Sequence, residues 1–290
     1  MDNKALNELY RFVIRHKLHA QSPVRMAALA RMLVAYNNLV CMTAENDYDE
    51  RNRIIRKIDA LFDAVDCRDT GGLLLRYRLT KDVMLAVYGD RDVECGDAYR
   101  DIVGRFVTSV DRVGMTLDEL DTMKCVVYEL GNIFADNTQF DYYPWFRERC
   151  EEWICEIGEN GSWQSVDLAV AARRLGLLED NRCVFNDCSF DDRMLSAYGY
   201  YKAEFERVFP LLNTHGDIGM LGAWADLLRM PGFLPCDIDL YDRVIGRMET
   251  IAGTVQPRSD IWYTAMSYVV EHRCLSIVGK AQEEMLRDIA

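Results

Sequence analysis

The sequence contains no apolar run of about 20 residues, the length that a membrane-spanning helix requires. Positive charge is also scarce, because 34 Lys and Arg stand against 47 Asp and Glu and give a formal net charge of −13. Nucleic-acid backbones and anionic membrane surfaces are bound through basic faces, so we expect neither as a partner of this acidic protein. Residues 1–20 mix charges with apolar positions and lack a small-residue cleavage site, which predicts a helix rather than a signal peptide.

Several enzyme motifs are missing as well. The sequence has no GxGxxG, P-loop, HExxH or GxSxG pattern. No motif therefore supports a nucleotide-binding, zincin or serine-hydrolase function. It also has no CxxC, and its 10 cysteines are spread singly along the chain. Single cysteines without an export signal are typical of reduced, mostly buried thiols, so we expect a soluble cytoplasmic protein.

Linkers and strand patterns are equally rare. No Gly/Ser-rich or Pro-rich stretch interrupts the chain, which predicts a single domain over residues 1–290. Alternation of apolar and polar residues with a period of two is nearly absent, so we expect little sheet and an all-α fold.

The clearest feature that is present is the stretch Asn213–Met230, NTHGDIGMLGAWADLLRM. Thr214 is a favourable N-cap, and Asp217 stands three residues later, as in a capping box. Apolar residues then recur at helical spacing, whereas Gly216 and Gly219 are too small to hold a neighbouring backbone at ordinary distance. Glycine costs up to about 1 kcal/mol in a helix, so we expect either a close helix contact or room for a ligand here.

Similar capped apolar helices recur about 47 residues apart along the whole chain. Their starts are Ser22, Thr70, Thr116, Ser162 or Ser165, Thr214 and Ser259. More charged helical patterns lie between them, at about residues 4–18, 48–65, 96–110, 143–157, 190–209 and 237–253. The pattern predicts six helical hairpins, with the capped helices inside and the charged helices outside. We expect these inner-helix residues to be buried: Leu29, Leu33, Val126, Leu168, Leu221, Leu228 and Met266.

Six hairpins can stack as an open α-solenoid or close into an (α/α)6 toroid. The terminal repeats of an open solenoid usually have a polar outer face. Here the first and last capped helices are as apolar as the middle ones, as Leu29, Leu33, Trp262 and Val269 illustrate. We therefore favour the closed toroid and keep the open solenoid as the alternative.

The residues His215–Leu228, HGDIGMLGAWADLL, resemble the H-G-x-x-G helix starts of lanthionine synthetase C-like proteins, which are α/α toroids. The resemblance implies that His215 lies near a zinc site, where that family activates a peptide thiol for addition to a dehydrated residue. The family's late Cys-His-Gly pair has no counterpart, since the nearest residues, His272, Arg273 and Cys274, occur in reversed order. Zinc is therefore possible and not favoured.

A second possible metal site consists of Cys183, Asp187 and Cys188 together with His215. A spacing of five positions between two thiolates is acceptable for zinc, provided that the ligands converge. With 10 cysteines in the chain, two thiols that are simply packed or exposed in a loop explain this pair more simply.

The loops that enter the inner helices of a toroid gather at one end, where their side chains can face one cavity. We expect His215 and Asp217 there as candidate catalytic residues, and Trp163, Asp167, Asp260 and Trp262 as candidate ligand-binding residues. Paired carboxyl groups and flat rings would suit a glycan, because glycoside cleavage uses one protonated and one ionised carboxyl group. The simpler interpretation is that the acids cap helices and the aromatic rings pack.

Two function classes follow. The favoured one is a protein that binds a peptide or partner protein in a central or end cavity, because no complete catalytic set can be assembled. The alternative is an α/α-toroid enzyme, either a lanthionine synthetase C-like peptide-modifying enzyme or a glycoside hydrolase or lyase. The sequence leaves open whether the chain is an enzyme, and it does not identify a cofactor.

Overall fold

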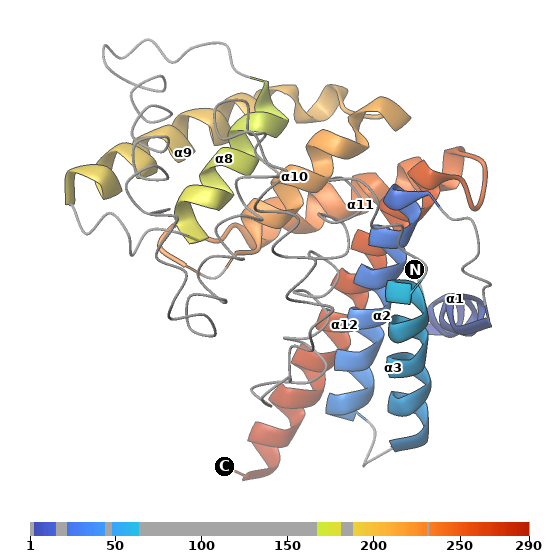
Figure 1. Cartoon of the computed structure of the whole chain (residues 1–290). Helices are drawn as coiled ribbons and strands as arrows, with labels where there is room; N and C mark the ends of the chain where they lie inside the picture. The colour runs from blue at the N-terminus through green and yellow to red at the C-terminus, as the bar shows by residue number, and fades with distance from the viewer. Residues whose placement is uncertain are drawn as a thin grey trace, which may run out of the picture. The chain divides into compact units, whose positions relative to one another are not determined.

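The computed structural model describes residues 3–15, 22–43, 48–63, 167–180, 188–230 and 232–289. Within these ranges the chain forms eight α-helices and two short 3-10 turns and contains no strand (Figure 1). The prediction of an all-α fold is confirmed for this part of the chain. None of the helices described is long and apolar enough to cross a membrane.

The helix bounds agree with the repeat pattern wherever the two can be compared. The helices are α1 (Asn3–Arg15), α2 (Pro23–Thr43), α3 (Tyr48–Asp63), α8 (Leu168–Asp180), α9 (Cys188–Val208), α10 (Ile218–Leu228), α11 (Ile238–Thr254) and α12 (Asp260–Ile289). The 3-10 turns η2 (Phe209–Leu211) and η3 (His215–Asp217) join α9 to α10. The four more charged patterns that fall in the described ranges match α1, α3, α9 and α11 within a few residues.

Three of the predicted capped starts are also confirmed, because helical structure begins directly after Ser22, Thr214 and Ser259. At the fourth, α8 begins after Asp167, and the serines proposed as its cap lie outside the described residues. Outside them too are Thr70, Thr116 and the patterns at 96–110 and 143–157.

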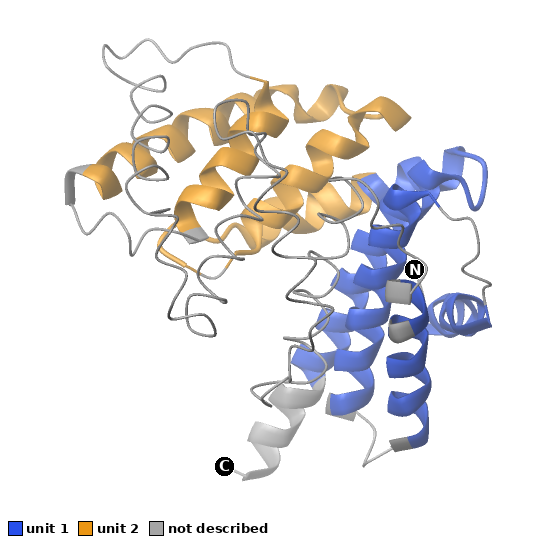
Figure 2. Ribbon diagram, viewed as in Figure 1, with its two compact units in different colours: residues 1–110, 248–290 blue, residues 111–247 orange. Residues whose placement is uncertain are grey.

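The chain divides into two compact units (Figure 2). The first combines residues 1–110 with residues 248–290, and the second comprises residues 111–247. The single repeat domain over residues 1–290 stays a prediction, because a stack of hairpins also divides into groups of neighbouring hairpins.

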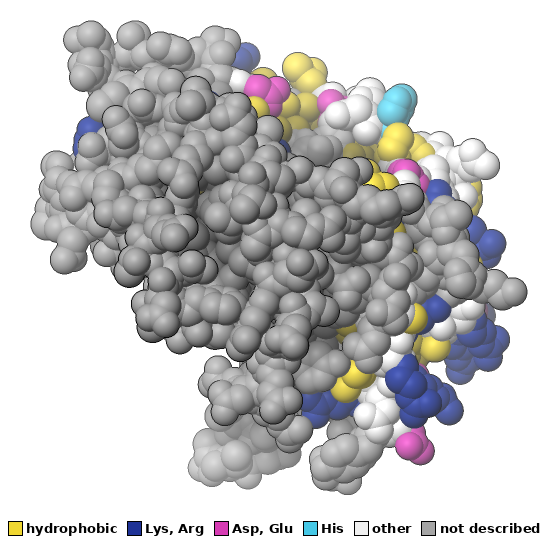
Figure 3. All heavy atoms as spheres, viewed as in Figure 1, with side chains coloured by type: hydrophobic (Ala, Val, Ile, Leu, Met, Phe, Trp, Pro, Cys, Tyr) yellow, Lys and Arg dark blue, Asp and Glu magenta, His cyan; other side chains and the backbone are white. Residues whose placement is uncertain are grey.

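Among the helices described in the first unit, α2 is the most deeply buried. It buries side chains around most of its circumference: Met26, Ala28, Leu29, Ala30, Met32, Leu33, Ala35, Tyr36 and Asn37. By contrast, α1 and α3 each bury one narrow stripe, and they expose arginines such as Arg11, Arg15, Arg53 and Arg56. On the face shown in Figure 3, Lys and Arg side chains gather over α1 and α3. The expected difference between an apolar capped helix and more charged helices therefore holds here.

The helices α2 and α12 lie side by side and run parallel. Ser22 at the start of α2 contacts Asp260 at the start of α12, and Arg31, farther along α2, pairs with Glu271. These partners are 238 and 240 positions apart in sequence, so the offset is nearly constant along the pair. A constant offset between two helices requires that both run in the same direction.

The second unit repeats this arrangement with α8 and α10. The indole of Trp224 in α10 donates a hydrogen bond of 3.0 Å to the Leu168 carbonyl at the start of α8. Near the end of α8, Glu179 accepts hydrogen bonds from the backbone of Phe233 and Leu234, just beyond α10. The two helices are therefore also parallel. From α9, the ring of Phe205 stacks on Trp224 with centroids 4.5 Å apart.

The burial predictions are mostly confirmed. Leu29, Leu33, Leu221 and Leu228 are each 0% exposed. Leu168 and Met266 are only partly buried, so these two predictions were wrong. Leu168 is the first residue of α8, and Met266 packs at the margin of the core cluster. Val126 lies outside the described residues.

Candidate functional site

The start of α10 is held by Asp217. Its Oδ2 atom accepts hydrogen bonds from the backbone N–H of Asn213 (2.9 Å), the N–H of Thr214 (2.7 Å) and the hydroxyl of Thr214 (2.8 Å). The predicted capping box is present. Partial burial opposes ionisation of this carboxyl group, but the hydrogen bonds from Thr214 and Asn213 outweigh it, so the pKa of Asp217 is below its ordinary value. The carboxylate is thus used to stabilise the helix start.

His215 is the first residue of η3, and it is exposed. Gly216 and Gly219 are exposed near it, and a Cβ atom added to Gly219 would meet no atom within 4 Å. Among the described residues no close helix contact explains Gly219, and room for a ligand beside it stays a prediction. Gly222, in contrast, is buried.

Asp167 caps α8, which packs beside α10. Its Oδ1 atom accepts hydrogen bonds from the N–H groups of Ala169 (2.8 Å) and Val170 (3.2 Å). These two donors belong to the first turn of the helix, where they have no intrahelical partner. Trp163, the aromatic residue predicted beside Asp167, lies outside the described residues.

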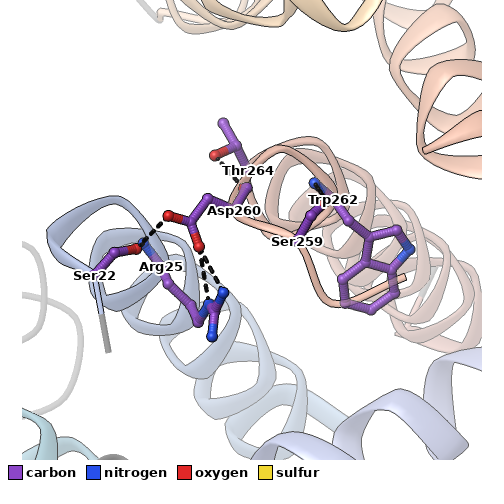
Figure 4. Close-up of polar contacts among 6 residues, drawn as sticks. All are labelled: Ser22, Arg25, Ser259, Asp260, Trp262 and Thr264. Carbon is purple, nitrogen blue, oxygen red and sulfur yellow. Dashed lines mark hydrogen bonds and ion pairs between the residues drawn. The ribbon is translucent and has the colours of Figure 1, made fainter. Parts of the chain in front are cut away.

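Asp260 joins the starts of two helices in the first unit (Figure 4). The hydroxyl of Ser22 donates to its Oδ2 (2.6 Å), and the Nε and Nη2 of Arg25 donate to its Oδ1 (3.0 and 2.7 Å). The hydrogen bond from Ser22 is the largest cause that lowers the pKa of Asp260; partial burial opposes it, and the hydrogen bond and charge of Arg25 add to it. Ser22 also accepts from the Arg25 N–H (3.2 Å) and so caps α2.

Trp262 lies on α12 two residues after Asp260, but the two side chains do not converge. Figure 4 shows the indole pointing away from the Asp260 carboxylate, as expected for positions two apart on a helix. The indole is partly buried against the core cluster and meets the edge of Tyr263 at 5.2 Å between ring centroids. It is therefore a packing residue on the side of α12 that faces the core.

The candidate residues thus fall into two groups. Asp167, His215 and Asp217 lie at the starts of α8 and α10, two parallel helices of the second unit. Asp260 and Trp262 belong to the first unit. A single cavity lined by all of them stays a prediction.

The sequence interpretation missed a polar cluster between α9 and the connection that follows α10. Lys202 forms an ion pair of 2.6 Å with Asp237, which also caps α11 through the Leu240 N–H. Tyr198 donates to the Pro235 carbonyl (2.8 Å). Burial, followed by the negative charge of Asp237, raises the pKa of Tyr198 to about 12, so the phenol stays protonated at neutral pH. In the sequence, this cluster could have been found from the spacing of four between Tyr198 and Lys202, which places both side chains on one helix face.

Metal binding has no support in the part of the chain that the structure describes, where no three His, Cys, Asp or Glu side chains are grouped as ligands. Zinc at Cys183, Asp187, Cys188 and His215 stays a prediction, because residues 183 and 187 lie outside that part. No family model, curated protein or solved structure matches the chain. The resemblance to lanthionine synthetase C-like proteins therefore rests on His215–Leu228 and stays a prediction as well.

Proposed function

We propose that this protein is a closed α/α toroid that binds a peptide or a partner protein at the end where its inner helices begin, without performing catalysis. The main observation behind the proposal is that the candidate acids already have structural hydrogen bonds. Each of the carboxylates of Asp167, Asp217 and Asp260 already accepts hydrogen bonds that cap or connect helix starts.

Closure of the toroid is supported by the pairing of α2 with α12. These are the first and last capped helices of the repeat pattern, and they pack parallel along their length. In an open solenoid each repeat contacts only its neighbours in sequence, so the first and last repeats stay apart. The same parallel arrangement of α8 and α10, which are consecutive inner helices, supports the assignment of α2 and α12 as neighbouring inner helices.

A non-catalytic role is supported by the ionisation of two of these acids. Glycoside cleavage needs one protonated and one ionised carboxyl group. The pKa values of Asp217 and Asp260 are both lowered, so both groups are ionised at neutral pH and neither is suited to be the proton donor. Trp262 packs against the core, which makes it a poor platform for a sugar ring.

A peptide ligand is supported by the surface of α10. His215, Gly216 and Gly219 expose an imidazole and a stretch of helix backbone without bulky side chains. A polypeptide can approach such a surface closely and form hydrogen bonds with the imidazole. Leu211, which is 75% exposed on the preceding turn, adds an apolar contact of the kind that anchors peptides.

The proposal is tested by selecting peptides from a random displayed library against the full chain and measuring their affinities for variants. We expect His215→Ala and Gly219→Leu each to weaken binding about tenfold or more, which corresponds to the loss of one good contact. His272→Ala, the same change at a partly buried position of α12, is the matched control and should bind unchanged.

Three outcomes would contradict the proposal. If the selected peptides bound His215→Ala, Gly219→Leu and His272→Ala equally well, the surface of α10 would not be their binding site. Stoichiometric zinc in the purified protein would favour the lanthionine synthetase C-like enzyme. Binding of oligosaccharides without a metal, together with failure to select any peptide, would favour the glycan-processing enzyme.

A further inference from the structure

The contact between α2 and α12 is defined here as the closure interface. Its residues belong to two chain segments that meet in one unit although most of the sequence lies between them. The chain's other described parallel pair, α8 and α10, is linked through α9 and η2. The closure interface has no such short connection, and Cys274 at its centre is a free thiol. Only non-covalent contacts keep α12 against α2.

Several of these contacts are polar and reach solvent. The side chains of Arg25 and Asp260 are 27% and 39% exposed, and those of Arg31 and Glu271 are 27% and 15% exposed. Ion pairs at such positions contribute little each and are screened by salt. The guanidinium of Arg31 also lies over the Tyr268 ring, 3.9 Å from its centroid.

The same helix also holds α1. Arg273 of α12 donates to the Asn3 side chain (3.1 Å), and Arg258, in the turn before α12, lies 4.4 Å from the centroid of the Phe12 ring. Release of α12 from the N-terminal helices would therefore break a row of arginine contacts in addition to the apolar ones.

Beneath the polar contacts lies an apolar layer. Leu29 and Leu33 of α2 belong to the same core cluster as Tyr263, Val270 and Cys274 of α12. The two buried polar side chains among the described residues, Asn37 and Ser267, are also on α2 and α12. Cys274 is 2% exposed, and burial raises the pKa of its thiol to about 12, so the thiol is unreactive while the interface is closed.

We infer that the closure interface is a latch: α12 separates from α2 in a local opening that leaves the second unit folded, and the bonds of Asp260 with Ser22 and Arg25 set how often this happens. Proteins open in cooperative parts whose free energies lie below that of global unfolding. An interface without a short covalent connection, with solvent-reaching ion pairs along it, is the natural place for such an opening. In a closed toroid this opening would admit an internal segment of a polypeptide; the latch itself rests only on the first unit.

The thiol of Cys274 is a built-in reporter of this opening. The experiment is alkylation of the folded, full-length protein with N-ethylmaleimide, with each cysteine followed by mass spectrometry. Cys41, which is exposed, gives the rate of an accessible thiol. Amide hydrogen exchange of α10 in the same samples shows whether the second unit stays folded.

The expected result is that Cys274 reacts more slowly than Cys41, and that the opening free energy obtained from the ratio of their rates is smaller than the one obtained from amide exchange of α10. The Cys274 rate should rise about fivefold in Asp260→Asn, and also in the wild type in about 1 M NaCl, because both changes weaken the ion pairs. Asp217→Asn, which removes a carboxylate cap from α10, is the matched control and should leave the Cys274 rate unchanged.

The latch would be overturned if the opening free energies from Cys274 alkylation and from α10 amide exchange were equal, because opening would then be global unfolding. It would also be overturned if neither salt nor Asp260→Asn changed the rate more than Asp217→Asn does. The salt arm uses the wild type, so it remains decisive even if a variant folds poorly.

Discussion

The hydroxyl of Ser22 donates a hydrogen bond of 2.6 Å to the carboxylate of Asp260, across a sequence separation of 238 residues. Arg25 binds the other oxygen of the same carboxylate. The first and last capped helices of the chain therefore begin next to each other and pack in parallel. This relationship makes Asp260 a connecting residue, and its role in ligand binding stays a prediction.

Replacing Asp260 should cost stability in a pH-dependent way. We expect Asp260→Asn to lower the free energy of unfolding by about 1 kcal/mol at neutral pH, because an exposed ion pair and a charged hydrogen bond are weakened. The folded-state pKa of Asp260 is lowered, so this stabilisation is full above the unfolded pKa of about 4 and is lost as the pH falls through the folded value.

Urea denaturation between neutral pH and about pH 2 checks this, with Asp192→Asn, an exposed carboxylate on α9, as the control. The wild type and Asp260→Asn should converge in stability at the acidic end. A difference that persists or grows there would show that the carboxylate does not act through its charge.

Leu221 tests the assignment of α10 as an inner helix. It is 0% exposed, and Leu221→Ala should lower the free energy of unfolding by about 2 to 5 kcal/mol, because it leaves a cavity in the core. Leu211→Ala makes the same chemical change at a side chain that is 75% exposed, and it should stay within about 0.5 kcal/mol. Similar losses for both variants in chemical denaturation would refute the assignment.

Two glycines should respond oppositely to alanine. Gly219→Ala should raise the free energy of unfolding by up to about 1 kcal/mol, because alanine favours the helix and its Cβ meets nothing within 4 Å. Gly232→Ala should lower it by about 1 to 3 kcal/mol, because the added Cβ would overlap the Glu179 carboxylate that binds the backbone of Phe233 and Leu234. Thermal unfolding of both variants distinguishes them, and a destabilised Gly219→Ala would mean that the space beside α10 is filled.

His215 should be dispensable for folding. The residue is exposed at the start of η3, so His215→Ala should cost less than about 1.5 kcal/mol of stability while it weakens binding of a peptide selected on the wild type. Calorimetry of binding and denaturation on the same sample separate the two effects. If the alanine variant fails to fold, His215 is structural and the binding surface on α10 should be abandoned.

Much of the local structure could be predicted from the sequence because it depends on neighbouring residues. Thr214 and Asp217 form their capping box through backbone groups within four positions, and α1 and α3 follow their own apolar stripes. The partners of Asp260 could not be predicted in this way, because Ser22 and Arg25 lie 238 and 235 positions away and no local pattern specifies that pairing.

The candidate site stays a prediction for the same reason. A sequence identifies an acid near a helix start, but it does not show whether the carboxylate is free or already bonded. Asp167 and Asp217 are bonded to their own helix starts, and Trp262 turns toward the core. His215 is exposed, which leaves it accessible to a ligand.

The measurement that tests the account most directly is disulfide formation between the starts of α2 and α12 in the doubly substituted chain Ser22→Cys/Asp260→Cys. The Ser22 Oγ and Asp260 Oδ2 atoms lie 2.6 Å apart, which brings the two helix starts close enough that a disulfide should form under mild oxidation and appear as one linked peptide pair in mass spectrometry. The control is Ser22→Cys/Leu275→Cys, whose second position is about 22 Å farther along α12. A high yield for the first pair and almost none for the control is the predicted result. Equal yields would contradict the pairing of the first and last helices, and with it the closed toroid.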